Sequence, residues 1–158
     1  MRIIFCLVLL YISFGLQAQK KNYLKFRDEL LSPSCGKVHD SAEVFTIIQR
    51  LENFDTTSIN KNLHIYYEDL GHYYWLASSR GGEIYFYKAI PVLNLALNHK
   101  PNSQKALWNL AFIYGFLHEC EKAKAYFATY HQYYPKAYES QDIIQQEKEL
   151  LAECESNQ

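Results

Sequence analysis

The chain has 158 residues, about the length of one ordinary domain and enough to bury a continuous core. Its 16 basic and 17 acidic residues nearly balance, giving a formal net charge of −1. This balance argues against a nucleic-acid-binding protein, because that class usually carries a clear excess of basic residues.

The first 18 residues have the pattern of a secretory signal peptide. Met1-Arg2 gives a short basic start, residues 3–16 are almost wholly apolar, and Ala18 offers a small residue for cleavage. The rival interpretation is an uncleaved membrane anchor, but the apolar run falls short of the roughly 20 residues that span a bilayer. Cleavage leaves residues 19–158 as a single helical domain. We expect no membrane span in that mature chain, and an exported protein, periplasmic or secreted.

Two predicted helices come first in the mature chain. Residues 21–31 carry apolar side chains at helical spacing and end before a Ser-Pro-Ser break. Asp40 is expected to cap a second helix, with Glu43 at the capping-box position and an apolar stripe that ends near Phe54. The two helices are expected to form a hairpin that covers the N-terminal face of the helices after it.

A first pair of longer helices is predicted at about 59–79 and 83–98. The Gly- and Ser-rich segment 78–82 is interpreted as a flexible turn between them. Pro91 lies inside the second helix of this pair. It is expected to kink or delay that helix, because proline removes one backbone hydrogen bond and its ring clashes with the preceding turn.

A second pair and a closing helix complete the chain. Asn102 or Ser103 is expected to cap the next helix, and His118 lies at a tight turn before a helix at about 119–134. A last helix, about 137–154, has a few apolar residues among many Gln, Glu and Lys. It is interpreted as a closing helix, apolar toward the preceding pair and polar outward.

Both pairs share one spaced set of residues. The set is Tyr67-x-x-Leu70-Gly71-x-x-Tyr74, Ala89-x-x-x-Leu93 and Pro101 in the first pair, and Leu107-x-x-Leu110-Ala111-x-x-Tyr114, Ala123-x-x-x-Phe127 and Pro135 in the second. Positions 89, 93, 96 and 101 recur 34 residues later. Pattern and period resemble the tetratricopeptide repeat, with repeats at about 64–101 and 104–135. The first repeat has six extra residues, because Leu70 and Leu110 are 40 apart.

The resemblance implies an all-α fold, a short α-solenoid of antiparallel helix pairs. Two repeats would stand between the N-terminal hairpin and the C-terminal closing helix. In such repeats the small residues mark the close approach of two helices, and here these are Gly71, Ala89, Ala111 and Ala123. The conserved pattern of the family is therefore packing chemistry, and it predicts a scaffold before it predicts a function.

The resemblance also implies a concave groove that is lined by the first helix of each repeat. The predicted partner-binding residues of this groove are Glu68, His72, Trp75, Lys105, Trp108, Asn109, Phe112 and Phe116. Family members that grip a peptide C-terminus use basic and Asn side chains there, and only Lys105 and Asn109 resemble such a set. We expect a ligand to be held by ring stacking and backbone hydrogen bonds. The alternative is that the terminal helices cover most of these rings.

Three cysteines remain after the predicted cleavage, so at least one is unpaired within a monomer. Cys120 begins a predicted helix, and a closing helix antiparallel to it returns Cys154 to the same level. In an oxidising compartment this favours a Cys120–Cys154 disulfide. The alternative is free cysteines at the ends of elements. Cys35 is then left in a loop.

No recognisable catalytic pattern occurs in the sequence. Gly-rich phosphate loops, nucleophile elbows and His-Glu-x-x-His pairs are absent, and His118-x-Cys120 is the only close His and Cys pair. We expect a non-catalytic protein- or peptide-binding module without cofactor or metal, an exported adaptor or scaffold in an envelope or secretion context. One alternative is a small inhibitor or immunity-type protein that blocks a toxin or exported enzyme. Another is a homodimer formed through Tyr-rich surfaces.

Overall fold

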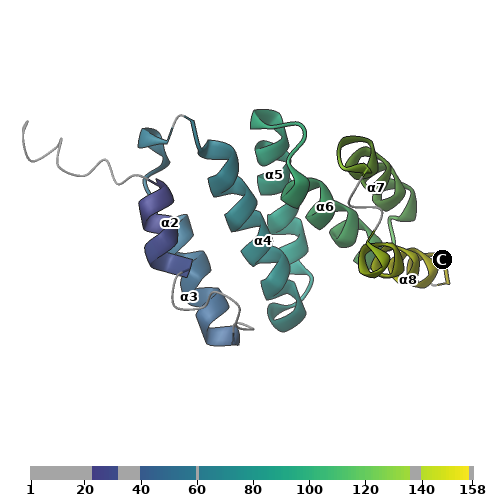
Figure 1. The fold of residues 1–158 in the computed structure, drawn as a ribbon. Helices are drawn as coiled ribbons and strands as arrows, with labels where there is room; N and C mark the ends of the chain where they lie inside the picture. Colours follow the sequence, from purple (N-terminus) through teal and green to yellow (C-terminus); the bar gives the residue numbers. More distant parts are fainter. Residues whose placement is uncertain (1–22, 32–39, 60, 136–139, 157–158) are drawn as a thin grey trace, which may run out of the picture.

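The computed structural model describes residues 23–31, 40–59, 61–135 and 140–156. Every regular element in those ranges is helical, which confirms the predicted all-α class. Figure 1 shows the helices following one another in chain order from the N-terminal to the C-terminal end. They are α2 (Tyr23–Leu31), α3 (Ser41–Glu52), the short 3-10 helix η2 (Thr56–Ser58), α4 (Leu63–Gly81), α5 (Ile84–His99), α6 (Gln104–Phe116), α7 (Cys120–Tyr133) and α8 (Gln141–Ser156).

Helix α3 begins and packs as its sequence predicts. The side chain of Asp40 accepts a hydrogen bond of 2.7 Å from the backbone N–H of Glu43, which satisfies one of the free donors at the helix start. The apolar stripe behind this cap is buried, with Val44 0% and Leu51 1% exposed. The link between α2 and α3, which contains Cys35, and the predicted signal peptide lie outside the described residues.

Helices α4 and α5 form the first close pair, and a glycine permits their approach. A Cβ atom added at Gly71 would lie 2.5 Å from Cγ of Leu93, a distance that no side chain tolerates. The facing Ala89 is fully buried. The spacing of small residues in the sequence therefore marks the actual contact between these two helices.

The six extra residues of the first pair lengthen helix α4 and do not enlarge the turn. Helix α4 has 19 residues against 13 in α6, so the predicted flexible turn at 78–82 is wrong. The hydroxyls of Ser78 and Ser79 donate to carbonyls one turn back, at 2.6 and 2.9 Å, so both residues stay within the helix. Gly82 ends it at a φ of 85°, a conformation that suits glycine.

One other boundary, and the expected effect of Pro91, also differ from the sequence prediction. Helix α4 begins at Leu63 and not near Ile59, because Asp55 caps the separate turn η2 before it. Helix α5 runs through Pro91 from Ile84 to His99, so the proline neither ends nor delays it. Pro91 lies on an exposed face of α5, where no packed neighbour constrains the turn that its ring displaces.

Helices α6 and α7 form the second close pair. Of the two predicted caps, Ser103 is the one that caps the start of α6. Its fully buried side chain accepts a hydrogen bond of 3.1 Å from the N–H of Ala106. His118 makes the tight turn with a φ of 56°, a left-handed conformation that is uncommon for a residue with a side chain. Tyr114 and Tyr126 stack across the pair at 5.5 Å between ring centroids.

Helix α8 closes the C-terminal end and is attached at three levels. Leu150 fills the space that Gly115 leaves on α6, where an added Cβ would lie 2.6 Å from its Cδ2. Further along, a disulfide joins Cys154 to Cys120 at the start of α7, with 5.8 Å between their Cα atoms. At the other end His131 of α7 and Glu147 of α8 approach to 2.6 Å. Residues 136–139, where the closing helix was predicted to begin, lie outside the described part.

Candidate functional site

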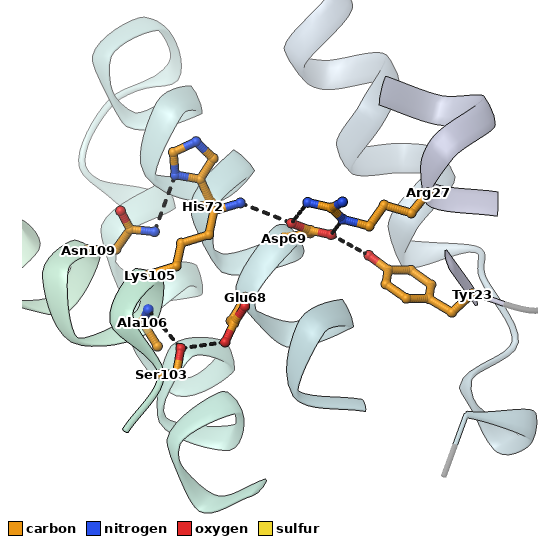
Figure 2. Close-up of polar contacts among 9 residues, drawn as sticks. All are labelled: Tyr23, Arg27, Glu68, Asp69, His72, Ser103, Lys105, Ala106 and Asn109. Atoms are coloured by element: carbon orange, nitrogen blue, oxygen red, sulfur yellow. Dashed lines mark hydrogen bonds and ion pairs between the residues drawn. The ribbon is translucent and has the colours of Figure 1, made fainter. Parts of the chain in front are cut away.

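A buried carboxylate joins three helices on the face where α4 meets α6. Asp69 of α4 is 2% exposed, and Figure 2 shows three side chains converging on it. From α2, the Tyr23 hydroxyl donates to it at 2.9 Å and Arg27 Nε at 2.5 Å. From α6, Lys105 Nζ donates at 2.9 Å. The carboxylate therefore adds directional polar contacts to the apolar packing of α2, in which Phe26 and Leu30 are buried.

The two cations decide the ionisation of Asp69. Burial by itself would raise the pKa of this carboxyl, but the ammonium of Lys105 and the guanidinium of Arg27 outweigh burial and hold the pKa below its ordinary value. Burial, together with the negative charge of Asp69, raises the pKa of the Tyr23 hydroxyl well above its usual range. The carboxylate is therefore ionised and Tyr23 is a protonated donor throughout the physiological pH range.

Two more polar contacts join α4 to α6 on either side of Asp69 along α4 (Figure 2). Glu68 accepts a hydrogen bond of 2.5 Å from the hydroxyl of Ser103, and Asn109 Nδ2 lies 3.2 Å from His72 Nδ1. Asn109 is 3% exposed. The polar residues that the sequence assigns to a groove thus bind one another. Their first structural effect is to hold the two helices in register.

An open hollow of about 500 Å³ lies beside these polar contacts, where the starts of α6 and α8 meet the end of α7. Its volume falls within the range of roughly 300–1,000 Å³ that is typical of ligand sites. Its walls combine aromatic rings with charged and amide side chains. They are Glu68, Lys100, Gln104, Lys105, Trp108, Tyr130, Tyr134, Ile143 and Gln146.

The aromatic wall of the hollow is held in place by contacts within the chain. The Trp108 ring lies 5.1 Å from the Tyr130 ring, and the Tyr130 hydroxyl accepts a hydrogen bond of 3.1 Å from Gln104 Nε2. The Tyr134 hydroxyl donates to the backbone carbonyl of Asn102. A ligand that enters meets side chains that are already ordered, which lowers the entropic cost of binding.

Half-buried rings extend from the hollow along the face of α6 and α4. Phe112 lies 4.9 Å from Trp108 and 6.3 Å from Trp75, measured between ring centroids. Helix α8 covers part of this row, since Trp108 and Phe112 pack against the cluster that contains Leu150. Phe116 is 43% exposed but stacks on Phe86 of α5, so it faces the first pair and not the hollow.

The structure therefore gathers only part of the predicted groove into one site. Glu68, Lys105 and Trp108 line the hollow, and the rings of Trp75 and Phe112 continue from it. His72, Asn109 and Phe116 are engaged elsewhere, as described above. That these residues bind a partner remains a prediction.

Sequence reasoning missed most of the hollow's walls. Tyr134 belongs to a visible Tyr pair before Pro135, but Ile143 and Gln146 enter the hollow only through the way α8 crosses the second pair.

The burial of Asp69, in contrast, could have been predicted from the sequence. Asp69 sits on the apolar stripe of Tyr66 and Tyr73, at a spacing that buries it, and a buried carboxylate needs a cationic partner.

Comparison of the chain with protein-family models, with curated proteins and with solved structures gave no match in any of the three. Within the described ranges, no three His, Cys, Asp or Glu side chains come together as a metal ion would require. No helix in the part of the chain that the structure describes is long and apolar enough to cross a membrane.

Asp69→Asn should destabilise the protein at neutral pH by about 3 kcal/mol, because it leaves two cations beside a buried neutral group. The pKa of Asp69 is lower in the folded state than in the unfolded state. The stability that its charge contributes is therefore complete above the unfolded-state pKa of about 3.9, and it is lost as the pH falls through the folded-state pKa. The stability difference between wild type and variant should therefore shrink below about pH 4. Urea unfolding followed by circular dichroism measures it.

Asp28→Asn is the matched control for this experiment, since Asp28 is an exposed carboxylate on α2 next to Arg27. Asp28→Asn should change the free energy of unfolding by no more than about 0.5 kcal/mol at every pH. If Asp69→Asn and the wild type lose stability in parallel on acidification, the carboxylate is not the charge centre described above.

Proposed function

We propose that this protein is a non-catalytic binding module that holds a segment of another protein in the hollow between α6, α7 and α8. The observation that carries the proposal is the composition of the hollow. Trp108 and Tyr134 offer flat apolar surface over the buried ring of Tyr130, and Gln104 and Gln146 offer amide donors and acceptors beside it. A peptide presents both kinds of group, an apolar side chain and a polar backbone, at a spacing of a few ångströms.

Charge neutralisation within the chain also favours a peptide over a polyanion. Lys105 is paired with Asp69, and Glu68 accepts the hydroxyl hydrogen of Ser103. These contacts leave no strong excess of positive charge in the hollow beyond the exposed Lys100. Rings and amides therefore supply most of the binding free energy, as aromatic anchors do at other protein interfaces.

The helix pairs α4–α5 and α6–α7 are, in this proposal, two tetratricopeptide-like repeats. The support is the 34-residue spacing in the sequence together with the full burial of its small positions, Ala89 and Ala123. The carboxylate-gripping mode of some family members does not suit this chain. Asn109 is buried against His72 and Lys105 is paired with Asp69, so neither is free to clamp a peptide terminus.

We also propose that the protein is exported and acts in an envelope or secretion context. The N-terminal 18 residues support this, and so does the Cys120–Cys154 disulfide, a bond that persists mainly in oxidising compartments. The N-terminal residue of the protein recovered from an exporting bacterial host tests the idea. We expect Gln19, whereas an intact Met1 would contradict cleavage.

Peptides selected on the purified protein from a random displayed library test the binding site. We expect selected peptides to alter the tryptophan emission, since Trp108 forms one wall of the hollow and the chain has only two tryptophans. Gln146→Trp places a bulky ring into the hollow from an exposed position on α8. It should weaken these peptides at least about tenfold, which corresponds to roughly 1.4 kcal/mol.

Gln145→Trp is the matched control, because Gln145 is also exposed on α8 but points about 100° away around the helix. The Gln145→Trp variant should bind the same peptides with the affinity of the wild type. The Gln145→Trp and Gln146→Trp variants should both keep the helical circular-dichroism signal. Peptides that bind the two variants equally well would place the binding site elsewhere. A selection that yields no binding peptide would contradict the proposal itself.

A further inference from the structure

The outer face of helix α5 carries an exposed apolar stripe that is separate from the hollow. Ile84 is 59%, Tyr87 58% and Leu95 40% exposed, and Pro91 between them is also exposed. Successive members are three, four and four residues apart, so at 100° per residue they fall within about 80° of one another around the helix. They form one continuous line along most of the length of α5, which we call the α5 stripe.

No described helix covers the α5 stripe. The opposite side of α5 packs on α4, where Ala89, Leu93 and Ala96 are all fully buried. Exposed apolar side chains are common singly, but a line of large ones along a helix marks an interaction surface. The identity of the occupant follows from the symmetry of the stripe and from its flanking charges.

The α5 stripe is self-complementary about Pro91. An isologous dimer requires that residue i of one copy meets residue j of the other, and j meets i. In an antiparallel crossing centred on Pro91, Tyr87 of each copy lies opposite Leu95 of the second copy, four residues to either side. The aromatic ring and the branched aliphatic side chain then meet twice.

The charges at the two ends of α5 fit the same arrangement. Glu83 is exposed at the start of α5, and Lys100 is exposed just after its end. The antiparallel crossing brings Glu83 of one copy to the level of His99 and Lys100 of the other, and it does so at both ends. Antiparallel helices also oppose their dipoles favourably. A parallel pairing would instead place like charges together.

We propose that a second copy of this chain covers the α5 stripe, in a symmetric dimer whose axis passes beside Pro91. The contact is one helix wide, so the interface is small and the dimer is of the weak class. The walls of the hollow on α6, α7 and α8 stay clear of this contact, Lys100 being the wall residue that both surfaces share, and each dimer therefore carries two binding sites. Two linked sites strengthen binding to a partner that has repeated segments.

Cysteine crosslinking in the full chain tests the position of the axis. In a Cys6→Ser, Cys35→Ser background, Pro91→Cys places a thiol beside its own symmetry mate and should form a covalent dimer on mild oxidation. Asn98→Cys is the matched control on the same exposed face of α5. Its two copies would lie about 21 Å apart, 14 residues at 1.5 Å, and should not crosslink. Equal crosslinking of both variants would overturn the proposed axis.

Light scattering gives the second measurement, and it does not depend on introduced cysteines. At roughly 100 µM, which suits a weak interface, the wild type should approach twice its monomer mass, and Tyr87→Asp with Leu95→Asp should remain monomeric. Glu83→Lys and Lys100→Glu should each weaken the dimer, and their combination should restore it. A monomeric wild type at this concentration overturns the proposal, whatever the peptide selection shows. An equally dimeric double-Asp variant would show that another surface is used.

Discussion

The ionised carboxylate of Asp69 is the interaction on which the arrangement of this protein depends. It lies in the core between α2, α4 and α6, and a buried charge is tolerated only where opposite charges and hydrogen bonds surround it. Arg27 and Lys105 approach it from opposite sides, one from the N-terminal hairpin and one from the second pair. Apolar packing also holds α2, through Phe26 and Leu30. A charge with directional partners fixes how they are placed relative to one another.

This constraint also shapes the surface where a partner would bind. Because Asp69 neutralises Lys105, and Ser103 and His72 engage Glu68 and Asn109, the face between α4 and α6 is largely satisfied by the chain itself. What stays open is the hollow further along, which the closing helix completes. The disulfide and the Leu150 contact hold α8 against the second pair, so the hollow depends on that closure.

The sequence predicted local structure well, because caps, small residues and apolar spacing act over a few residues. The Asp40 cap and the role of Gly71 are examples. The lengthening of α4 was missed, since the serines that looked like a turn bond back to their own helix. The hollow was predicted only in part. Its composition depends on how α8 crosses α6 and α7, and no short-range pattern encodes that crossing.

Hydrogen exchange in Asp69→Asn tests the role of this carboxylate most directly. The account predicts that the amides of α2, at Tyr23–Leu31, lose protection strongly. Those of α7, at Cys120–Tyr133, should exchange as in the wild type, because α7 packs on α6 and α8 without contacting Asp69. Unchanged protection in α2, or an equal loss in every helix, would contradict the claim that Asp69 fixes the N-terminal helix to the rest of the protein.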